Sequence, residues 1–305
     1  MNPIDISVII PVKNGQRYLE SVLKGVFSQE INAEFEVIIV DSGSTDKTLD
    51  IIAQYPVRLY QIEENEFNHG LTRNLGISKA QGKYIILMTA DAIPCDNYWM
   101  KRLIENIKED QGVAGVYSKQ VPHKESALLT QIRVNRFFTS SMEKRISQIK
   151  EIKDYEKLPP KEKHRLCNFD TISACIRKDV WEKFPFPKTN FAEDLEWTKK
   201  VLEAGYKIVY EPHSVIYHSH DFSPLEWYRK NRMNSGKLFT LFGIDTVNNP
   251  LRLFVAAVFY IFRDTYLIYK IKRNPKDILA NMHLVILYSF FGTLGQYRGI
   301  KDSFS

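Results

Sequence analysis

Phe35 to Asp46 reads FEVIIVDSGSTD, an apolar run that ends at an aspartate and passes into turn and helix-capping residues. A run of this kind, without polar alternation, is typical of a strand buried on both faces of a parallel sheet. The residues after Asp41 favour turns and helix N-termini, so we expect a helix to include Leu49, Ile51 and Ile52. Ile6 to Pro11 is a second near-continuous apolar run, followed by apolar residues at helical spacing.

Outward from these stretches, strand and helix patterns continue to alternate. Val57 to Ile62 and Tyr84 to Met88 read as strands, with a helical pattern at Gly70 to Ala80 between them. Alternation of this kind predicts an α/β fold with a mostly parallel central sheet flanked by helices. In such sheets ligands bind beyond the carboxyl ends of the strands, which is where the polar residues gather here. No GxGxxG or GxxxxGK[ST] motif follows a strand, so dinucleotide and P-loop sites lose their usual support.

The later part of the chain indicates an insertion and a helical extension. Strand patterns occur at 171–176, 207–210 and 215–218, with a helix at 191–204. The polar, basic stretch 122–167 interrupts the α/β pattern, and an insertion of that length is more often functional than idle. After Pro224 the chain is mainly helical, with breaks near Pro250 and Pro275. We therefore predict a sheet domain at 1–222, with an insertion at 122–167, and a helical region at 223–305.

Charge and cysteine usage narrow the setting. The net charge of +6 favours an anionic partner. No nucleic-acid-binding module accompanies that charge, so we expect no nucleic acid. Cys95, Cys167 and Cys175 form no CxxC pair and leave one cysteine over, which favours a reducing compartment. The first residues carry no basic segment of a secretory signal, so we expect a cytoplasmic protein.

Three clusters of polar residues follow strands in the first half of the pattern. Asp41 could accept a hydrogen bond from a nucleobase, or it could cap its own turn. Arg73, near the start of a helix, could pair with a phosphate or simply be solvated. Asp91 follows an apolar strand, where a carboxylate could bind a hard divalent cation such as Mg²⁺ or Mn²⁺.

A fourth cluster lies farther along the chain. Glu193 and Asp194 begin a helix, where its dipole favours acids, but one of them could also act as a general base. His218 and His220 end a strand pattern, and their spacing of two residues places both on one face. We therefore predict that one of these histidines joins Asp91 as a metal ligand.

Taken in order, these segments resemble glycosyltransferase family 2, inverting enzymes with the GT-A nucleotide-diphospho-sugar transferase fold. The resemblance is carried by ISVIIPVKN, EVIIVDSGSTDKT, GLTRNLGISKAQGKYIILMTADA and AEDLEW, and covers Ile6 to about His220. Finer segments resemble the bacterial rhamnosyltransferase branch: FNHGLTRN, TADAIP, the HSH at 218–220 and WYRKNRMNSG. The QxxRW signature of processive synthases is missing, which favours the addition of one sugar or a few.

The resemblance implies a role for each matching residue. Asp194 is the expected catalytic base, oriented by Glu193, and Asp91 with His218 or His220 is expected to hold the metal. Thr89 stands where the family often has the first aspartate of an Asp-x-Asp motif. The residues expected to border the donor nucleotide and its phosphates are Pro11, Lys13, Asn14, Asp41, Arg73, Asn74, Thr89, Arg229 and Arg232.

The resemblance also implies an activity. We expect L-rhamnose to pass from dTDP-L-rhamnose to a glycan or lipid-linked acceptor in cell-surface polysaccharide synthesis, with residues 122–167 on the acceptor side. One alternative keeps the fold and uses a UDP-hexose or UDP-N-acetylhexosamine donor. Another is a non-catalytic nucleotide- or carbohydrate-binding relative, which the replacement at Thr89 keeps open.

The C-terminal helices have their own expected role. Leu251 to Ile271 and Ile278 to Tyr297 are rich in aliphatic and aromatic residues, with basic residues beside them. Asn281 and His283, among other polar residues and glycines, dilute the second stretch, so a surface lying on an anionic membrane is favoured over a spanning helix. Packing on the catalytic core or formation of a homodimer is the competing interpretation. The expected location is therefore the cytoplasm, at the inner face of the cell membrane.

Overall fold

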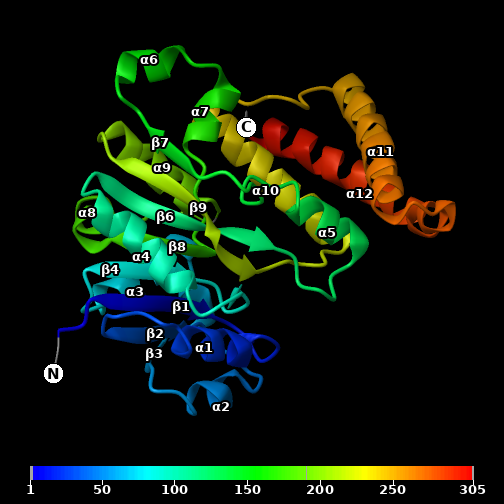
Figure 1. Cartoon of the computed structure of the whole chain (residues 1–305). Helices are drawn as coiled ribbons and strands as arrows, with labels where there is room; N and C mark the ends of the chain where they lie inside the picture. The colour runs from blue at the N-terminus through cyan, green and yellow to red at the C-terminus, as the bar shows by residue number, and fades with distance from the viewer. Residues whose placement is uncertain (1–2, 190, 304–305) are drawn as a thin grey trace. The chain divides into compact units, whose positions relative to one another are not determined.

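The computed structural model describes residues 3–189 and 191–303 and divides into two compact units (Figure 1). The first, which we call the sheet unit, comprises the chain up to Val121 together with 138–157 and 166–218. The second, the helical unit, comprises 122–137, 158–165 and the chain from Ser219 onward. The insertion predicted at 122–167 is thus shared between the two units.

The sheet unit is built on a nine-stranded sheet in the order β3-β2-β1-β4-β8-β6-β9-β5, with β7 paired to β9. Its first half is parallel, with β2 beside both β1 and β3, and β1 beside β4. These strands are β1 (Ile6–Val12), β2 (Phe35–Asp41), β3 (Arg58–Gln61) and β4 (Tyr84–Met88). Three of the four are almost wholly buried, as their continuous apolar runs predict.

The second half of the sheet contains the antiparallel pairs. Its strands are β5 (Ile93–Pro94), β6 (Val113–Val121), β7 (Arg145–Gln148), β8 (Ser173–Arg177) and β9 (Lys207–Tyr217). The strand β9 is continuous where the sequence predicts two strands. Its register against β6 shifts after Ser118, so that Glu211 and Val215 pair with successive residues of β6. The residues between them, including Pro212, bulge from the ladder, which explains the interrupted apolar pattern.

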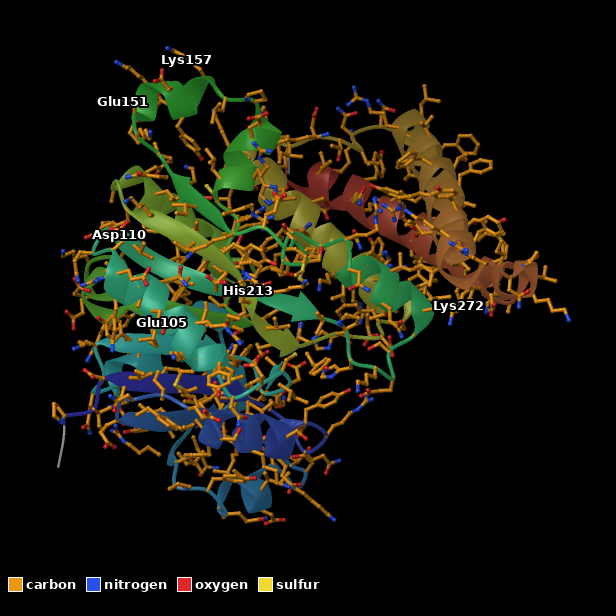
Figure 2. The ribbon with its side chains drawn as sticks, viewed as in Figure 1. Glu105, Asp110, Glu151, Lys157, His213 and Lys272 are labelled. Carbon is orange, nitrogen blue, oxygen red and sulfur yellow. The ribbon has the colours of Figure 1, made fainter. Side chains whose placement is uncertain are left out.

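Helices of the sheet unit pack their apolar sides onto this sheet (Figure 1). Trp99, at the start of α4, is fully buried and donates its indole N–H to Ser173 Oγ at 2.8 Å. Asp110, just after α4, pairs with Lys207 of β9 at 2.7 Å, and Figure 2 shows it at one end of the strands. The helices are α1 (Leu19–Phe27), α2 (Thr48–Ile52), η1 (Glu64–Glu66), α3 (His69–Ser78), α4 (Trp99–Glu109), α6 (Ile152–Lys157), α8 (Lys178–Lys183) and α9 (Glu193–Glu203).

The helical unit contains α5 (Leu128–Val134), most of α7 (Pro160–Leu166), α10 (Pro224–Phe242), α11 (Pro250–Lys272) and α12 (Pro275–Asp302). Each of the last three begins at a proline directly after a capping side chain, from Ser223, Asn249 and Asn274 respectively. Proline suits the first helical position because its missing N–H would have no partner there. The breaks predicted near Pro250 and Pro275 are confirmed as helix starts.

One described helix, α12, is long and apolar enough by length and composition to cross a membrane. Its glycines have a packing function, because a Cβ at Gly292 would lie 2.7 Å from the indole nitrogen of Trp227 in α10. A Cβ at Gly295 would overlap the carbonyl oxygen of Tyr228, and a Cβ at Gly299 that of Arg232, both in α10. The glycines therefore let α10 and α12 approach more closely than side chains would allow.

Candidate active site

The loops after β1 and β2 are tied together by side chains. Asn14 adopts a left-handed backbone conformation with φ of 52°. Its side-chain oxygen accepts a hydrogen bond from the Thr45 N–H at 2.9 Å, and its own N–H donates to Ser44 Oγ at 2.9 Å. Asn tolerates this conformation better than most residues, so the cross-link fixes an otherwise costly turn. The result is a braced rim at the carboxyl ends of β1 and β2.

Asp41 sits beneath this rim and is fully buried. Its carboxylate accepts from the N–H groups of Gly43 and Ser44, both at 3.2 Å, and from the Ser44 hydroxyl. The turn-capping role allowed by the sequence is therefore present. Lys13 forms an ion pair with Glu64, and Pro11 lies half-buried in β1. Contact between these residues and a nucleotide stays a prediction.

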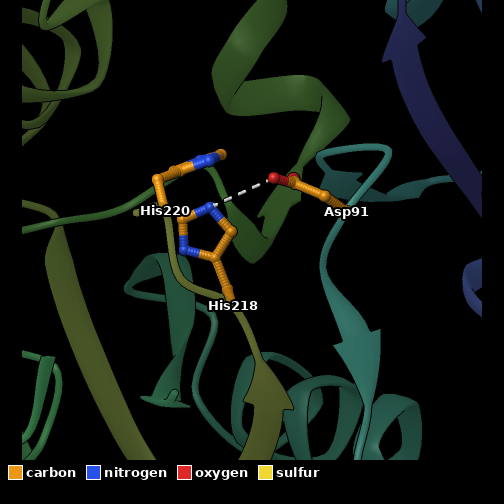
Figure 3. Close-up of side chains that lie close together, drawn as sticks. All are labelled: Asp91, His218 and His220. Carbon is orange, nitrogen blue, oxygen red and sulfur yellow. Dashed lines mark ion pairs between the residues drawn. The ribbon is translucent and has the colours of Figure 1, made fainter. Parts of the chain in front are cut away.

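Asp91, His218 and His220 lie close together at the ends of β4 and β9 (Figure 3). The cause is backbone pairing: β5 begins just after Asp91 and pairs antiparallel with the last residues of β9, Ile93 with Tyr217. His218 Nε2 lies 3.7 Å from Asp91 Oδ2, and one ligand atom from each of the three residues lies within 4.8 Å of the others. Asp91 and His218 approach from opposite sides, and the His220 ring lies beside that of His218 (Figure 3).

This donor set fits a divalent cation. Two ligands of one ion, with metal–ligand bonds of about 2.1 Å, lie about 3–4 Å apart, which the Asp91–His218 distance satisfies. One carboxylate and two imidazoles suit a first-row divalent metal. Thr89, two residues before Asp91, has a buried hydroxyl with no hydrogen-bond partner among the described residues. Its predicted contact with the donor is not tested by the structure.

Glu193 and Asp194 open α9 directly after Ala192, whose φ of 55° is left-handed and therefore strained for alanine. The Glu193 carboxylate lies 2.8 Å from Arg73 Nη1 and accepts from the Thr171 hydroxyl at 3.2 Å. Arg73 also donates to the His69 carbonyl at 3.0 Å, and its Nε is buried without a partner among the described residues. Glu193 is thus the ion-pair partner of Arg73. Among the described contacts, no hydrogen bond joins Glu193 to Asp194.

Asp194 has an electrostatic environment suited to proton transfer. Burial raises its pKa well above the usual carboxyl range, and the nearby charges of Glu193 and Asp170 raise it further. The Leu195 N–H and Arg73 act in the opposite direction but do not overcome these effects. A carboxylate with a raised pKa is a stronger base for an acceptor hydroxyl, provided that it is ionised at the working pH. Asp194 can therefore act as a general base.

The other predicted donor-binding residues have structural partners. The Asn74 side chain donates to the Phe186 carbonyl at 2.8 Å and accepts from the Trp181 indole at 2.7 Å. It thereby joins α3 to α8 and the loop that follows. Arg232, in α10 of the helical unit, pairs with Asp302 at 2.6 Å, and Arg229 is exposed on the same helix. A role for these three residues in donor binding stays a prediction.

Two further buried residues of this region, Gln120 and Asp170, are not among the site residues predicted from the sequence. The side-chain oxygen of Gln120, in β6, lies 3.0 Å from His218 Nδ1, and the side-chain NH₂ group of Gln120 donates to Asp170 at 2.6 Å. Asp170 lies in the segment just before β8, which begins at Ser173. A polar residue at the border of an apolar strand was the available signal for each.

The sequence model described as "Glycosyl transferase family 2" matches residues 7–179. The chain belongs to this family. It is 33% identical over 229 residues to the O-antigen chain rhamnosyltransferase RfbN of Salmonella typhimurium, covering 74% of this chain and 69% of that protein. It is 28% identical over 228 residues to the O-antigen chain rhamnosyltransferase WbaN of Salmonella anatum, covering 73% and 69%.

Solved structures of similar fold come from more distant proteins. The mannosyltransferase PcManGT of Pyrobaculum calidifontis, in complex with GDP-Man and Mn²⁺, superimposes with a TM-score of 0.57 at 18% identity, covering 96% of this chain and 75% of that chain. Residues 1–349 of TarS from S. aureus, in complex with UDP, give 0.55 at 18% identity, covering 97% and 91%. The predicted GT-A fold is therefore confirmed. This family 2 protein is a glycosyltransferase. The solved structures of similar fold include one with Mn²⁺ bound.

Proposed function

We propose that this family 2 protein transfers a single L-rhamnosyl residue from dTDP-L-rhamnose to a glycan or lipid-linked acceptor of cell-surface polysaccharide synthesis, with inversion. The choice of sugar and of acceptor class is supported by similarity to two O-antigen chain rhamnosyltransferases. The observation that carries transfer itself is the proximity of the two predicted functional groups, which a buried polar network connects. Asp91 lies 3.7 Å from His218, which is hydrogen-bonded through Gln120 to Asp170, and the charge of Asp170 acts on Asp194.

The residues then have separate tasks. Asp91, His218 and His220 would hold the divalent cation, which neutralises the negative charge that develops on the departing diphosphate. Asp194 takes the proton from the acceptor hydroxyl as that oxygen attacks the anomeric carbon. Glu193 and Arg73 form a buried ion pair whose charges act on Asp194. A single displacement from the face opposite the diphosphate inverts the anomeric centre, so a β-L-rhamnosyl donor gives an α-L-rhamnoside.

The donor assignment is tested by calorimetry on the full chain with dTDP-rhamnose, dTDP, UDP-glucose and UDP-N-acetylglucosamine, each with Mn²⁺, Mg²⁺ or chelator. We expect metal-dependent binding of the two dTDP ligands at least tenfold tighter than that of the UDP ligands. Preference for a UDP ligand would overturn rhamnose and favour the alternative donor class. Absence of binding to all four, with or without metal, would contradict the proposal and favour the non-catalytic alternative.

A further inference from the structure

A buried chain of polar side chains runs behind the candidate metal ligands in the sheet unit. His218 Nδ1 lies 3.0 Å from Gln120 Oε1, and Gln120 Nε2 donates to Asp170 Oδ2 at 2.6 Å. The three side chains come from β6, from the residue after β9 and from the segment before β8. Each of these residues is less than one-tenth exposed. Their contacts are therefore shielded from competition by water.

The direction of these hydrogen bonds follows from the carboxylate at the end of the chain. Asp170 Oδ1 accepts from the Ile172 N–H at 2.9 Å, so both of its oxygens act as acceptors. Gln120 must then turn its NH₂ group toward Asp170 and its carbonyl oxygen toward His218. A carbonyl oxygen can only accept, so the Nδ1 atom of His218 carries the proton. In the neutral imidazole, the other ring nitrogen, Nε2, then has its lone pair on the side of Asp91.

We propose that Gln120 and Asp170 are positioning residues that hold His218 in the tautomer required to bind a divalent cation through Nε2. A metal-binding imidazole needs an unprotonated nitrogen toward the ion, and a hydrogen bond from its other nitrogen fixes both tautomer and ring orientation. This inference rests on the proposed metal site and adds to it two residues that do not touch the ion. It also gives the buried Asp170 a role behind the site.

The first test measures the tautomer itself without any metal. In ¹⁵N-labelled full-length protein, long-range ¹H–¹⁵N spectra distinguish a protonated from an unprotonated ring nitrogen. We expect His218 to show a protonated Nδ1 and an unprotonated Nε2. In the Asp170→Asn variant the new amide can donate, so the Gln120 amide can invert and offer its NH₂ group to Nδ1. The Nε2-protonated form should then appear, and an unchanged wild-type tautomer would overturn the proposal.

The second test measures affinity for Mn²⁺ alone, by electron paramagnetic resonance of the free ion. Loss of such an outer hydrogen bond typically weakens metal binding by 10- to 100-fold. We expect this loss in Asp170→Asn and Gln120→Leu. The matched control is Asn106→Leu, which removes another buried amide–carboxylate hydrogen bond, from Asn106 to Glu211 at 2.9 Å. The control should lose stability without losing Mn²⁺ affinity, whereas equal loss in all three variants would contradict the positioning role.

The two tests separate this inference from the proposed function. If the wild-type protein binds no Mn²⁺, the metal site fails while the tautomer measurement still decides the role of Gln120 and Asp170. If Gln120→Leu does not fold, the shape-conserving Asp170→Asn variant carries both measurements. Wild-type Mn²⁺ affinity in a folded Asp170→Asn protein would overturn the inference even if sugar transfer were confirmed.

A second observation, independent of the site, concerns the outer face of α11 in the helical unit. Its large apolar side chains recur at steps of three and four residues, which places them on one face of the helix. Leu251, Phe254 and Phe262 are 72%, 65% and 71% exposed. The remaining exposed members of this face are Val255, Phe259, Tyr266 and Tyr269. The opposite face, with Ala257 and Ile268, is buried within the helical unit.

The charges around this apolar face are almost all positive. Asp264 is the sole acidic residue of α11, and it is buried against Arg263 at 2.7 Å. Exposed cations border the face and continue through the turn into α12: Arg252, Lys270, Lys272, Arg273 and Lys276. An apolar face with a basic border complements a bilayer of anionic lipids, whose headgroups attract cations while the acyl region accepts aromatic side chains. A solvent-exposed apolar patch of this kind is otherwise unfavourable.

We infer that the α11 face docks on the surface of an anionic membrane. The test is sedimentation of the full chain with vesicles of phosphatidylcholine alone or mixed with phosphatidylglycerol. We expect binding to the anionic vesicles, weakened at least tenfold by Phe254→Ser/Phe262→Ser and by Lys270→Glu/Lys272→Glu/Arg273→Glu. Ile146→Ser is the matched control, because Ile146 is 63% exposed but lies in β7.

The same variants distinguish a membrane from a second copy of the chain. Vesicle binding that is equal for wild type and both α11 variants would overturn the inference. A wild-type dimer in light scattering that binds no vesicle, and that dissociates in Phe254→Ser/Phe262→Ser, would assign the face to dimerisation instead. Loss of vesicle binding in the Ile146→Ser control would also contradict a role specific to α11.

Discussion

Arg73 and Glu193 form an ion pair of 2.8 Å in which each side chain is only 6% exposed. Arg73 comes from the first turns of α3 and Glu193 from the first turn of α9, so the pair joins the two helices. Because both charges are removed from water, either one alone would be costly. The pair lies beside Asp194, the predicted base, and contributes to the field that acts on it.

Breaking this pair from one side should strongly destabilise the protein. Arg73→Met leaves Glu193 as a buried, unpaired charge, so we expect a loss of about 3–5 kcal/mol in the free energy of unfolding. Arg73→Met/Glu193→Gln should recover much of that loss because no charge remains buried. Denaturant unfolding measures both. Lys199→Met, in the half-exposed Lys199–Glu203 pair, should cost less than about 1 kcal/mol. Additive losses in the double variant would contradict the coupling.

Asp194→Asn should remove transfer while leaving the donor site intact. An amide cannot accept the acceptor's proton, so turnover should fall by about 10²–10⁴-fold. Donor affinity measured by calorimetry should stay within about threefold of wild type, because the expected role is proton transfer alone. Turnover close to that of the wild-type protein would show that another group is the base.

The raised pKa of Asp194 predicts the acidic limb of the pH–rate profile. The base must be ionised, so kcat/KM should fall as pH drops through a pKa above the ordinary aspartate value of about 3.9. Burial is the main cause of the shift and the Glu193 charge the next. Glu193→Gln removes that second cause, so its acidic limb should move to lower pH. A limb that stays in place would assign it to a different group.

The same shift predicts how stability depends on pH. Between the unfolded pKa and the higher folded pKa of Asp194, the folded state binds a proton that the unfolded state has released. This contribution to stability is therefore present at low pH and is lost as pH rises through the folded pKa. Asp194→Asn lacks this loss, so it should gain stability relative to wild type as pH rises. Thermal unfolding of both proteins at several pH values measures this difference. Melting temperatures that change with pH by the same amount in both proteins would contradict the raised pKa of Asp194.

The packing of α12 on α10 predicts sensitivity to a single added methyl group. A Cβ at Gly299 would overlap the Arg232 carbonyl oxygen and the Ser235 hydroxyl. We expect Gly299→Ala to cost about 1–3 kcal/mol in the free energy of unfolding, despite the higher helix propensity of alanine. Leu279→Ala, at a position 79% exposed on the same helix, is the control and should change stability little. A Gly299→Ala protein more stable than wild type would contradict this prediction, because α10 and α12 would then accommodate the methyl group at no cost.

Most of the strands and helices, and the strand ends at which a functional site was expected, could be predicted from the sequence. The strands β1, β2 and β4 follow from continuous apolar runs, and α11 and α12 follow from capping residues before Pro250 and Pro275. These signals are local, since backbone conformation and burial periodicity are set by neighbouring residues. The same locality placed Asp91 and His218 at strand ends, where parallel sheets gather their ligands.

Which of those residues lie close together could be seen only in the folded chain. Asp91 lies beside His218 because β5 pairs with the end of β9, a contact between distant segments that no local pattern encodes. Arg73, expected to face a phosphate, is held by Glu193 from another helix. Gln120 and Asp170 acquire their significance from hydrogen bonds across three segments of the sheet. Which residue a side chain contacts depends on long-range packing. The periodicity of the sequence sets the face of a helix or strand on which a residue lies, but not what packs against that face.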